Sequence, residues 1–204
     1  LEWVIRKATR AARKIPDNWE DLCERSTIRK AHLIKEYDIP SRLYVNSDQT
    51  QVVYAPGNKL TYAKIGCQQV SLVGGDEKRA FTVMVSVSND GLLLPFQAIY
   101  EGKTLASIPS ATSPHYNDII STGALLEFSG TSTYWSNMKT MKNFVSNILD
   151  PYFNRVRQEL GVPLTQKALW QIDVWSVHRS VEFRDWMRNN YPNIILDYVP
   201  GGCT

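Results

Sequence analysis

Two aspartates in this sequence each come after a short run of apolar residues that favours a β-strand. Asp48 follows Leu43–Val45, and Asp173 directly follows Leu169–Ile172. If the two strands are parallel neighbours in one sheet, their carboxylates meet at the same edge. Like charges held that close repel unless a divalent cation lies between them, and oxygen ligands favour Mg²⁺ or Mn²⁺ over zinc. The pair therefore predicts a metal centre of the kind that activates water for phosphodiester cleavage.

Each aspartate also has an ordinary structural interpretation. Asp48 can end a strand or form an Asx turn before Gln49-Thr50, and Asp173 can cap a following helix. For Asp48 the spacing alone favours the structural interpretation, so further observations must decide.

The elements that would position these aspartates are predicted from hydrophobic periodicity. Residues 1–38 have the pattern of two helices, one ending at Ile15 and one running from Trp19 to Lys35, and Pro40 begins a different region. Strands are predicted at 43–45 (with 52–54 as continuation or neighbour), 68–73, 80–88, 92–100, 168–174 and 194–196. Turns are predicted at 55–58 and 89–91, a long irregular connection at 102–133, and helices at 135–149, 150–160 and 181–189.

This order, three antiparallel strands and then an alternating α/β half, predicts a ribonuclease-H-like mixed sheet. We expect a helical arm at residues 1–40 and the core at residues 41–204. The chain has 204 residues, a net charge of +3 and no apolar run that approaches the roughly 18 residues of a membrane span. Its charge permits a nucleic-acid partner without requiring one. Cys23, Cys67 and Cys203 lack zinc spacing, so we expect reduced thiols.

An ordered series of short segments runs through the α/β region. It comprises Asn46-Ser47-Asp48-Gln49-Thr50, the strand pair joined at Asp90-Gly91 with Leu94-Pro95 after it, Tyr100-Glu101-Gly102-Lys103, the segment from Ile172-Asp173 to His178, and Tyr198–Thr204. Over about residues 20–204 this series resembles the catalytic domain of DDE-superfamily endonucleases, the pogo-like, mariner-type transposases. Each motif alone is short, and the resemblance depends on their order.

The resemblance implies metal-dependent DNA strand cleavage and strand transfer. Asp48 and Asp173 would match the first and second catalytic acids and hold Mg²⁺ or Mn²⁺. His178 would either support that site from behind or contact DNA, against the plain alternative of a histidine on a helix face. The partners would be transposon-end and target DNA, with a homodimer and a nuclear location as further expectations and no membrane.

The resemblance also exposes two departures. Gln49 stands where the family often has Glu, although that neighbour does not hold the metal. The family's third acid lies just past the threonine that Thr204 matches, so we expect a C-terminally truncated core with two of three metal-binding carboxylates, and weak or absent catalysis from this chain alone. The alternatives are a domesticated, non-catalytic DNA-binding or chromatin protein and an inactive relic of a transposable element.

Other charged and aromatic residues receive weaker interpretations. A basic cluster near the N-terminus either contacts phosphates or forms a solvated helix face: Arg6, Lys7, Arg10, Arg13 and Lys14. Trp135 and the helical stripe from Met138 to Tyr152 are predicted to pack in the core. Four further acids are interpreted as structural or surface groups rather than metal ligands: Asp76, Glu77, Asp90 and Glu101. Asp197 lies before the position that the resemblance gives to the third acid, so it is not taken as a metal ligand.

Overall fold

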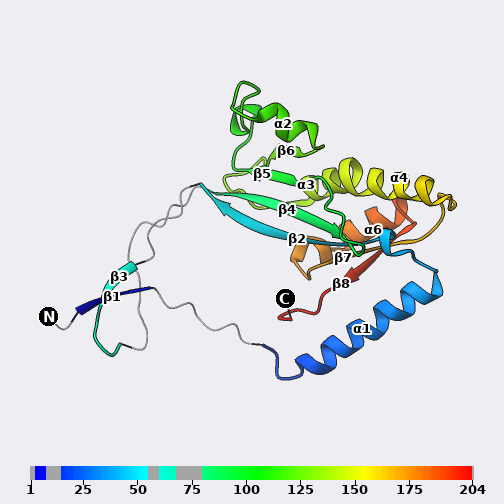
Figure 1. The fold of residues 1–204 in the computed structure, drawn as a ribbon, viewed down its shortest axis with the longest axis horizontal. Coiled ribbons are helices and arrows are strands. Elements are labelled where there is room, and N and C mark those ends of the chain that lie inside the picture. Colours follow the sequence, from blue (N-terminus) through cyan, green and yellow to red (C-terminus); the bar gives the residue numbers. More distant parts are fainter. Residues whose placement is uncertain (1–2, 8–14, 55–59, 68–79, 204) are drawn as a thin grey trace.

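A computed structural model describes residues 3–7, 15–54, 60–67 and 80–203 of the chain. Its main feature is a six-stranded mixed sheet in the order β6-β5-β4-β2-β7-β8 (Figure 1). The strands are β2 (Tyr44–Val53), β4 (Ala80–Ser88), β5 (Gln97–Tyr100), β6 (Leu125–Phe128), β7 (Ala168–Ile172) and β8 (Ile194–Tyr198). β2, β4 and β5 pair antiparallel, whereas β6, β7 and β8 each join a neighbour in parallel. The predicted ribonuclease-H-like α/β sheet is confirmed.

The hairpin predicted after β4 is present, but its second strand starts late. Gly91 has a φ of 93° and donates its N–H to the Ser88 carbonyl, as the predicted turn requires. The Leu94 N–H still bonds to Ser86, at 2.9 Å. Pro95 has no N–H to donate, and regular pairing resumes only in β5.

The described helices include those predicted after residue 16 and two short helices that were not predicted, at residues 116–121 and 176–179. They are α1 (Trp19–Glu36), α2 (Tyr116–Ser121), α3 (Met138–Phe144), α4 (Asp150–Leu160), α5 (Ser176–Arg179) and α6 (Val181–Asn190), with short 3-10 turns at Ser41–Leu43 and Leu105–Ser107. None of the helices in the described part of the chain is long and apolar enough to cross a membrane.

One continuous helical rod runs from α3 into α4 through a π-helical turn at Val145–Leu149. Asp150 has helical dihedrals and donates its N–H to the Val145 carbonyl, five residues back. The helices predicted at 135–149 and 150–160 therefore join without a break, and Asp150 does not cap α4. Pro151 has no N–H to donate to the preceding turn, and the wider π turn lies directly before it.

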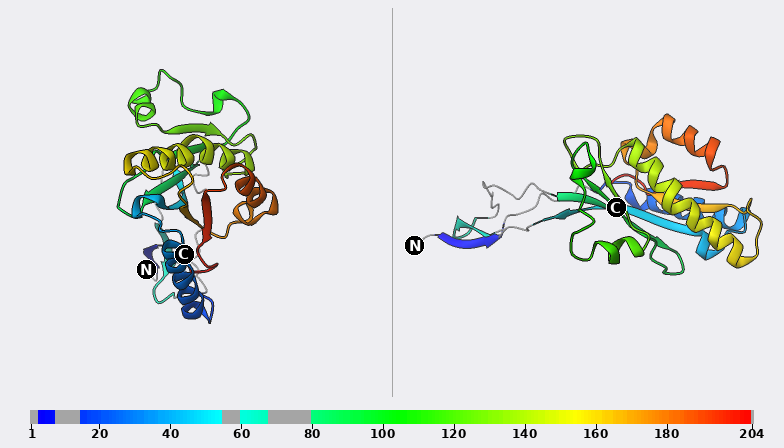
Figure 2. Two further views of the ribbon diagram at one scale, coloured as in Figure 1. Left: turned by 90° about the vertical axis from the view of Figure 1, so that its right-hand side faces the viewer. Right: turned by 90° about the horizontal axis from the view of Figure 1, so that it is seen from above.

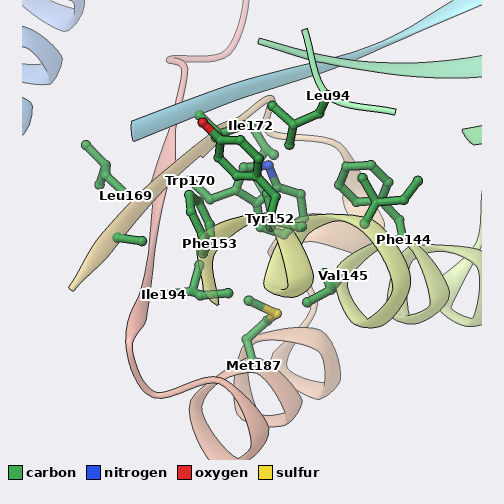
Figure 3. Packing of buried hydrophobic residues seen from close by; sticks show 14 of the residues in the cluster. Leu94, Phe144, Val145, Tyr152, Phe153, Leu169, Trp170, Ile172, Met187 and Ile194 are labelled. Atoms are coloured by element: carbon green, nitrogen blue, oxygen red, sulfur yellow. The ribbon is translucent and has the colours of Figure 1, made fainter. Parts of the chain in front are cut away.

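The core lies between this helical rod, α6 and one face of the sheet. Figure 3 shows the side chains of Phe144, Phe153 and Met187 gathered around β7, whose five residues are all buried. The predicted stripe is confirmed: four of its members are buried and Met138 is partly buried against the same cluster. Trp135 is 58% exposed, so its predicted place in the core is wrong. It stands before the Asn137 cap of α3, outside the helical stripe.

Two further predictions differ from the structure. Trp3–Lys7 forms strand β1, paired antiparallel with β3 (Leu60–Lys64), where a helix was predicted. This small sheet lies away from the main body (Figures 1 and 2), and the alternating Trp3, Ile5 and Lys7 suit a strand as well as a helix. The predicted irregular connection contains α2 and β6. Residues 55–58 and 68–73, predicted as a turn and a strand, lie outside the described residues.

Candidate active site

Strand register aligns the two candidate catalytic acids. In the parallel pair of β2 and β7, Tyr44 is opposite Leu169 and Asn46 is opposite Gln171, a constant offset of 125 residues (169 − 44 and 171 − 46). The pairing ends there and β7 ends at Ile172, but the same register continued by two residues would bring Asp48 opposite Asp173. Neighbouring strands lie about 4.8 Å apart, so the continued register predicts that the two residues are close neighbours.

Asp48 lies on an open face of the sheet. It is exposed, as are Asn46 and Thr50, which share its face of β2. Across the antiparallel pair it faces Val85, itself 36% exposed. Asp48 Oδ1 accepts the Gln49 N–H at 2.8 Å. This part of the sheet is therefore accessible to a large substrate.

The residue before Asp48 fixes its position from the core side. The buried Ser47 hydroxyl lies 2.6 Å from that of Ser86 on β4, and it accepts a hydrogen bond of 2.8 Å from Trp170 Nε1 on β7. These contacts join the three central strands behind Asp48. A shift of β2 by one residue would break both contacts and move Asp48 to the buried face.

Asp173 is held by its own neighbours in the chain. Its Oδ1 lies 2.8 Å from His178 Nδ1 and accepts the Trp175 N–H at 3.3 Å. The hydrogen bond from His178 is the main reason that the pKa of this carboxyl is lowered, and partial burial opposes it. The carboxylate is thus favoured in its charged form, as a metal ligand requires. It does not cap α5, because the N-cap position belongs to Trp175.

His178 lies behind Asp173 and not on the surface. Its side chain is only 3% exposed, and its ring packs edge-on against Trp175 and near Trp170 and Phe183. The Nε2 atom is buried and has no hydrogen-bond partner in the described part of the molecule. Of the two roles predicted for this histidine, its burial favours support of Asp173 over contact with DNA.

The donor atoms at this point suit a hard divalent cation. Among the described residues, neither Asp48 Oδ2 nor Asp173 Oδ2 accepts a hydrogen bond, so each carboxylate retains an open oxygen. Oxygen donors are what Mg²⁺ and Mn²⁺ prefer. Within the same residues no group of three or more His, Cys, Asp or Glu side chains could hold a metal ion.

A buried polar network lies nearby that sequence reasoning missed. Asp197 on β8 is 1% exposed; its Oδ1 lies 2.7 Å from Arg29 of α1 and its Oδ2 accepts Gln171 Nε2 at 3.1 Å. Tyr44 donates its hydroxyl proton to Gln171 Oε1 at 2.8 Å. Both oxygens of Asp197 are therefore occupied, which agrees with its exclusion as a metal ligand. Arg29 and Asp197 are far apart in sequence, so no local pattern indicated the pair.

The remaining predicted residues lie outside this centre. Gln49 Nε2 lies 3.5 Å from Met141 Sδ, on the core side of β2. Asp90 lies 3.6 Å from Arg42 and accepts a hydrogen bond from Ser88, and Glu101 is exposed. Arg6 and Lys7 belong to β1, whereas five residues fall outside the described part of the chain: Arg10, Arg13, Lys14, Asp76 and Glu77.

Comparison with known proteins found similarity in structure only. No family model and no curated protein matches the chain. At 15% identity, it is similar to a pre-cleavage Mos1 transpososome (TM-score 0.50, 96% of this chain and 48% of that one). It is also similar to the Mos1 mariner paired-end complex with Mn, with a TM-score of 0.48 and 15% identity over 94% of this chain and 46% of that one. The Mos1 transposase paired-end complex with left transposon end is similar too, with a TM-score of 0.48 and 15% identity over 96% of this chain and 48% of that one. The chain thus spans about half the length of the chains that it matches. Its fold, a ribonuclease-H-like mixed sheet preceded by a helix, is that of the mariner-type Mos1 transposase.

Proposed function

We propose that this chain is the core of a DDE transposase, in which Asp48 and Asp173 hold a divalent cation for DNA strand cleavage and strand transfer. The observation that supports the proposal is the register of β2 and β7, which, continued by two residues, would bring these two acids side by side on a fold similar to that of the Mos1 transpososome. The open sheet face around Asp48 leaves room for a DNA strand. Action as a homodimer on transposon ends and target DNA, in the nucleus, belongs to the same proposal.

In this function the two acids have the same task but different supports. Asp48 is placed by the hydrogen bonds of Ser47 to the neighbouring strands, and Asp173 by the hydrogen bond from His178. Each offers one oxygen outward. Asp48 and Asp173 would hold Mg²⁺, which would supply a lowered pKa for the attacking water and offset charge on the phosphate. His178 keeps the Asp173 carboxylate ionised and in one orientation.

Metal-dependent thermal stabilisation tests the proposal. At Mn²⁺ of about ten times its Kd, the wild type gains about 1.4 kcal/mol, a rise in Tm of roughly 3–6 °C for a domain of this size. Asp48→Asn and Asp173→Asn should each lose most of that rise. The control is Asp118→Asn, which changes an exposed acid of α2 and should retain it. An equal rise in all four proteins would rule out a metal centre at Asp48 and Asp173.

A second candidate is a non-catalytic DNA-binding protein derived from a transposase. Such a protein would keep the fold without the metal centre. Incubation of supercoiled plasmid with the chain and Mn²⁺ separates the two functions. Nicking that Asp48→Asn abolishes supports the nuclease, whereas DNA binding without nicking and without a Mn²⁺-dependent rise in Tm supports the alternative.

A further inference from the structure

A small hollow beside Asp173 is lined by two arginines. Its volume is about 260 Å³, and its lining residues are Val174, Arg179, Arg184 and Tyr198. Tyr198 of this lining donates its hydroxyl proton to the His178 carbonyl, and the His178 ring contacts the Asp173 carboxylate, so the hollow lies near the proposed metal ligand. Neither arginine was singled out from the sequence, because neither belongs to a run of basic residues.

The corner between α5 and α6 fixes where these arginines lie. Arg179 is the last residue of α5, and Arg184 lies in the second turn of α6. Ser180 caps α6 with its side chain. Tyr198, at the end of β8, donates its hydroxyl proton to the His178 carbonyl at 2.8 Å and ties the corner to the sheet. The arginines therefore extend from a braced corner of the fold.

The hollow is positively charged and has no acidic counterpart. In the described part of the chain no carboxylate lies within 4.0 Å of Arg179 or Arg184, whereas the next arginine of α6, Arg188, pairs with Asp185 at 2.8 Å. Burial raises the pKa of the Tyr198 phenol, and the charges of Arg184 and Arg179 oppose that rise. The charges of both guanidinium groups therefore reach the Tyr198 phenol, which lines the hollow.

The hollow continues into a second one along β8. This neighbour has a volume of about 280 Å³ and shares Arg184 and Tyr198 with the first, with Leu196 and Ile194 in its floor. The two hollows thus place apolar side chains of β8 beside the arginines. That combination suits an anionic group borne on a less polar chain.

We propose that Arg179 and Arg184 bind a backbone phosphate of the DNA strand that passes Asp173. This inference rests on the proposed function, because the DNA strand that the arginines would hold is the substrate proposed for Asp48 and Asp173. A guanidinium presents paired N–H donors that match two phosphate oxygens. Phosphate contacts fix the register of a strand without reading its sequence. The pair therefore sets which phosphodiester lies opposite the two acids.

Salt-dependent DNA binding tests this inference. Fluorescence anisotropy of a short labelled duplex is measured with the wild type, with Arg179→Gln/Arg184→Gln and with Arg25→Gln/Arg155→Gln. The last protein is a matched control, since it loses the same charge from exposed arginines that pair with Asp21 and Glu159. Loss of one phosphate contact should reduce the slope of log K against log salt by about 0.9 and weaken binding about tenfold at low salt. The control should keep a slope close to that of the wild type.

Three results would overturn the inference. The first is an equal salt slope in the two double variants, and the second is no DNA binding by the wild type. The third is that inorganic phosphate stabilises the wild type but not Arg179→Gln/Arg184→Gln, while the two proteins bind DNA equally well. The last result would assign the hollow to a free phosphate. Failure of the proposed function is seen separately, because the Mn²⁺-dependent rise in Tm depends on Asp48 and Asp173 and should persist in the arginine variant.

Discussion

The ion pair between Arg29 and Asp197 gives a test of how α1 is attached to the sheet. The Asp197 side chain is 0% exposed and that of Arg29 is 48% exposed, with 2.7 Å between them. Arg29 Nη2 also donates to the Tyr198 carbonyl at 2.9 Å. The two partners are therefore unequal, since one is enclosed by protein and the other still reaches water.

This inequality predicts different costs for removing each partner. Arg29→Gln leaves a buried carboxylate with Gln171 as its remaining hydrogen-bond donor, and we expect a loss of about 3 kcal/mol. That figure is the lower end of the range for a broken buried pair, because half of the Arg29 side chain is solvated. Asp197→Asn removes the buried charge and leaves a cation that water can hydrate, so we expect about 1 kcal/mol. For a domain of this size, Tm should fall by roughly 6–12 °C and 2–4 °C, respectively.

Urea and thermal unfolding, followed by circular dichroism, measure these costs. The double variant Arg29→Gln/Asp197→Asn should be close to Asp197→Asn alone, because no buried charge remains to be stranded. Arg25→Gln is the control on the same helix; its pair with Asp21 is exposed and should contribute at most about 0.5 kcal/mol. If Arg29→Gln matched this control, or if the two single costs added, the argument from burial would be refuted.

Three further predictions concern the core and one buried acid. Trp170→Phe removes the hydrogen bond to Ser47 but keeps most of the packing, so the free energy of unfolding measured in urea should fall by about 1–2 kcal/mol. An unchanged free energy of unfolding would contradict a role for that bond. Phe144→Ala opens a cavity at a fully buried site and should cost about 3–5 kcal/mol, with a value under about 1 kcal/mol arguing against this packing. Burial raises the pKa of Glu127 above 4.5, despite hydrogen bonds that lower it. Its contribution to the free energy of unfolding is therefore complete below about pH 4.5 and is lost as the pH rises through the folded-state pKa. Urea unfolding at a series of pH values should show that the wild type loses stability relative to Glu127→Gln as the pH rises. The opposite trend would contradict this prediction.

The strands that build the centre of the sheet were predictable because their burial is simple. β7 is buried on both faces and is apolar except for Gln171, and β4 is rich in β-forming residues. β6 was missed because Leu125–Phe128 is only four residues long and half-buried, and it follows a segment rich in Ser and Pro. Its place beside β5 depends on parallel pairing across the sequence, which leaves no local pattern.

The pairing of Asp48 with Asp173 was predicted for a reason that holds only in part. Asp173 does follow the end of its strand, but Asp48 lies in the middle of β2, which runs on to Val53. The two acids would align only if the parallel register of β2 and β7 continues past Ile172. The ion pair of Arg29 with Asp197 and the basic hollow could not be predicted, since both depend on which side chains the folded chain brings together.

Buried side chains of the folding core hold the two candidate acids in place. Ser47 and Trp170 connect the strands from the core side, and His178 packs against that same Trp170 while it holds Asp173. Both acids are thus positioned by buried groups that belong to the folding core and do not depend on a metal. Because the positions are set on folding, a cation that binds there need not reorganise the sheet. A variant that loosens Trp170 should therefore weaken Mn²⁺ binding as well as stability, although this side chain touches neither acid's open oxygen.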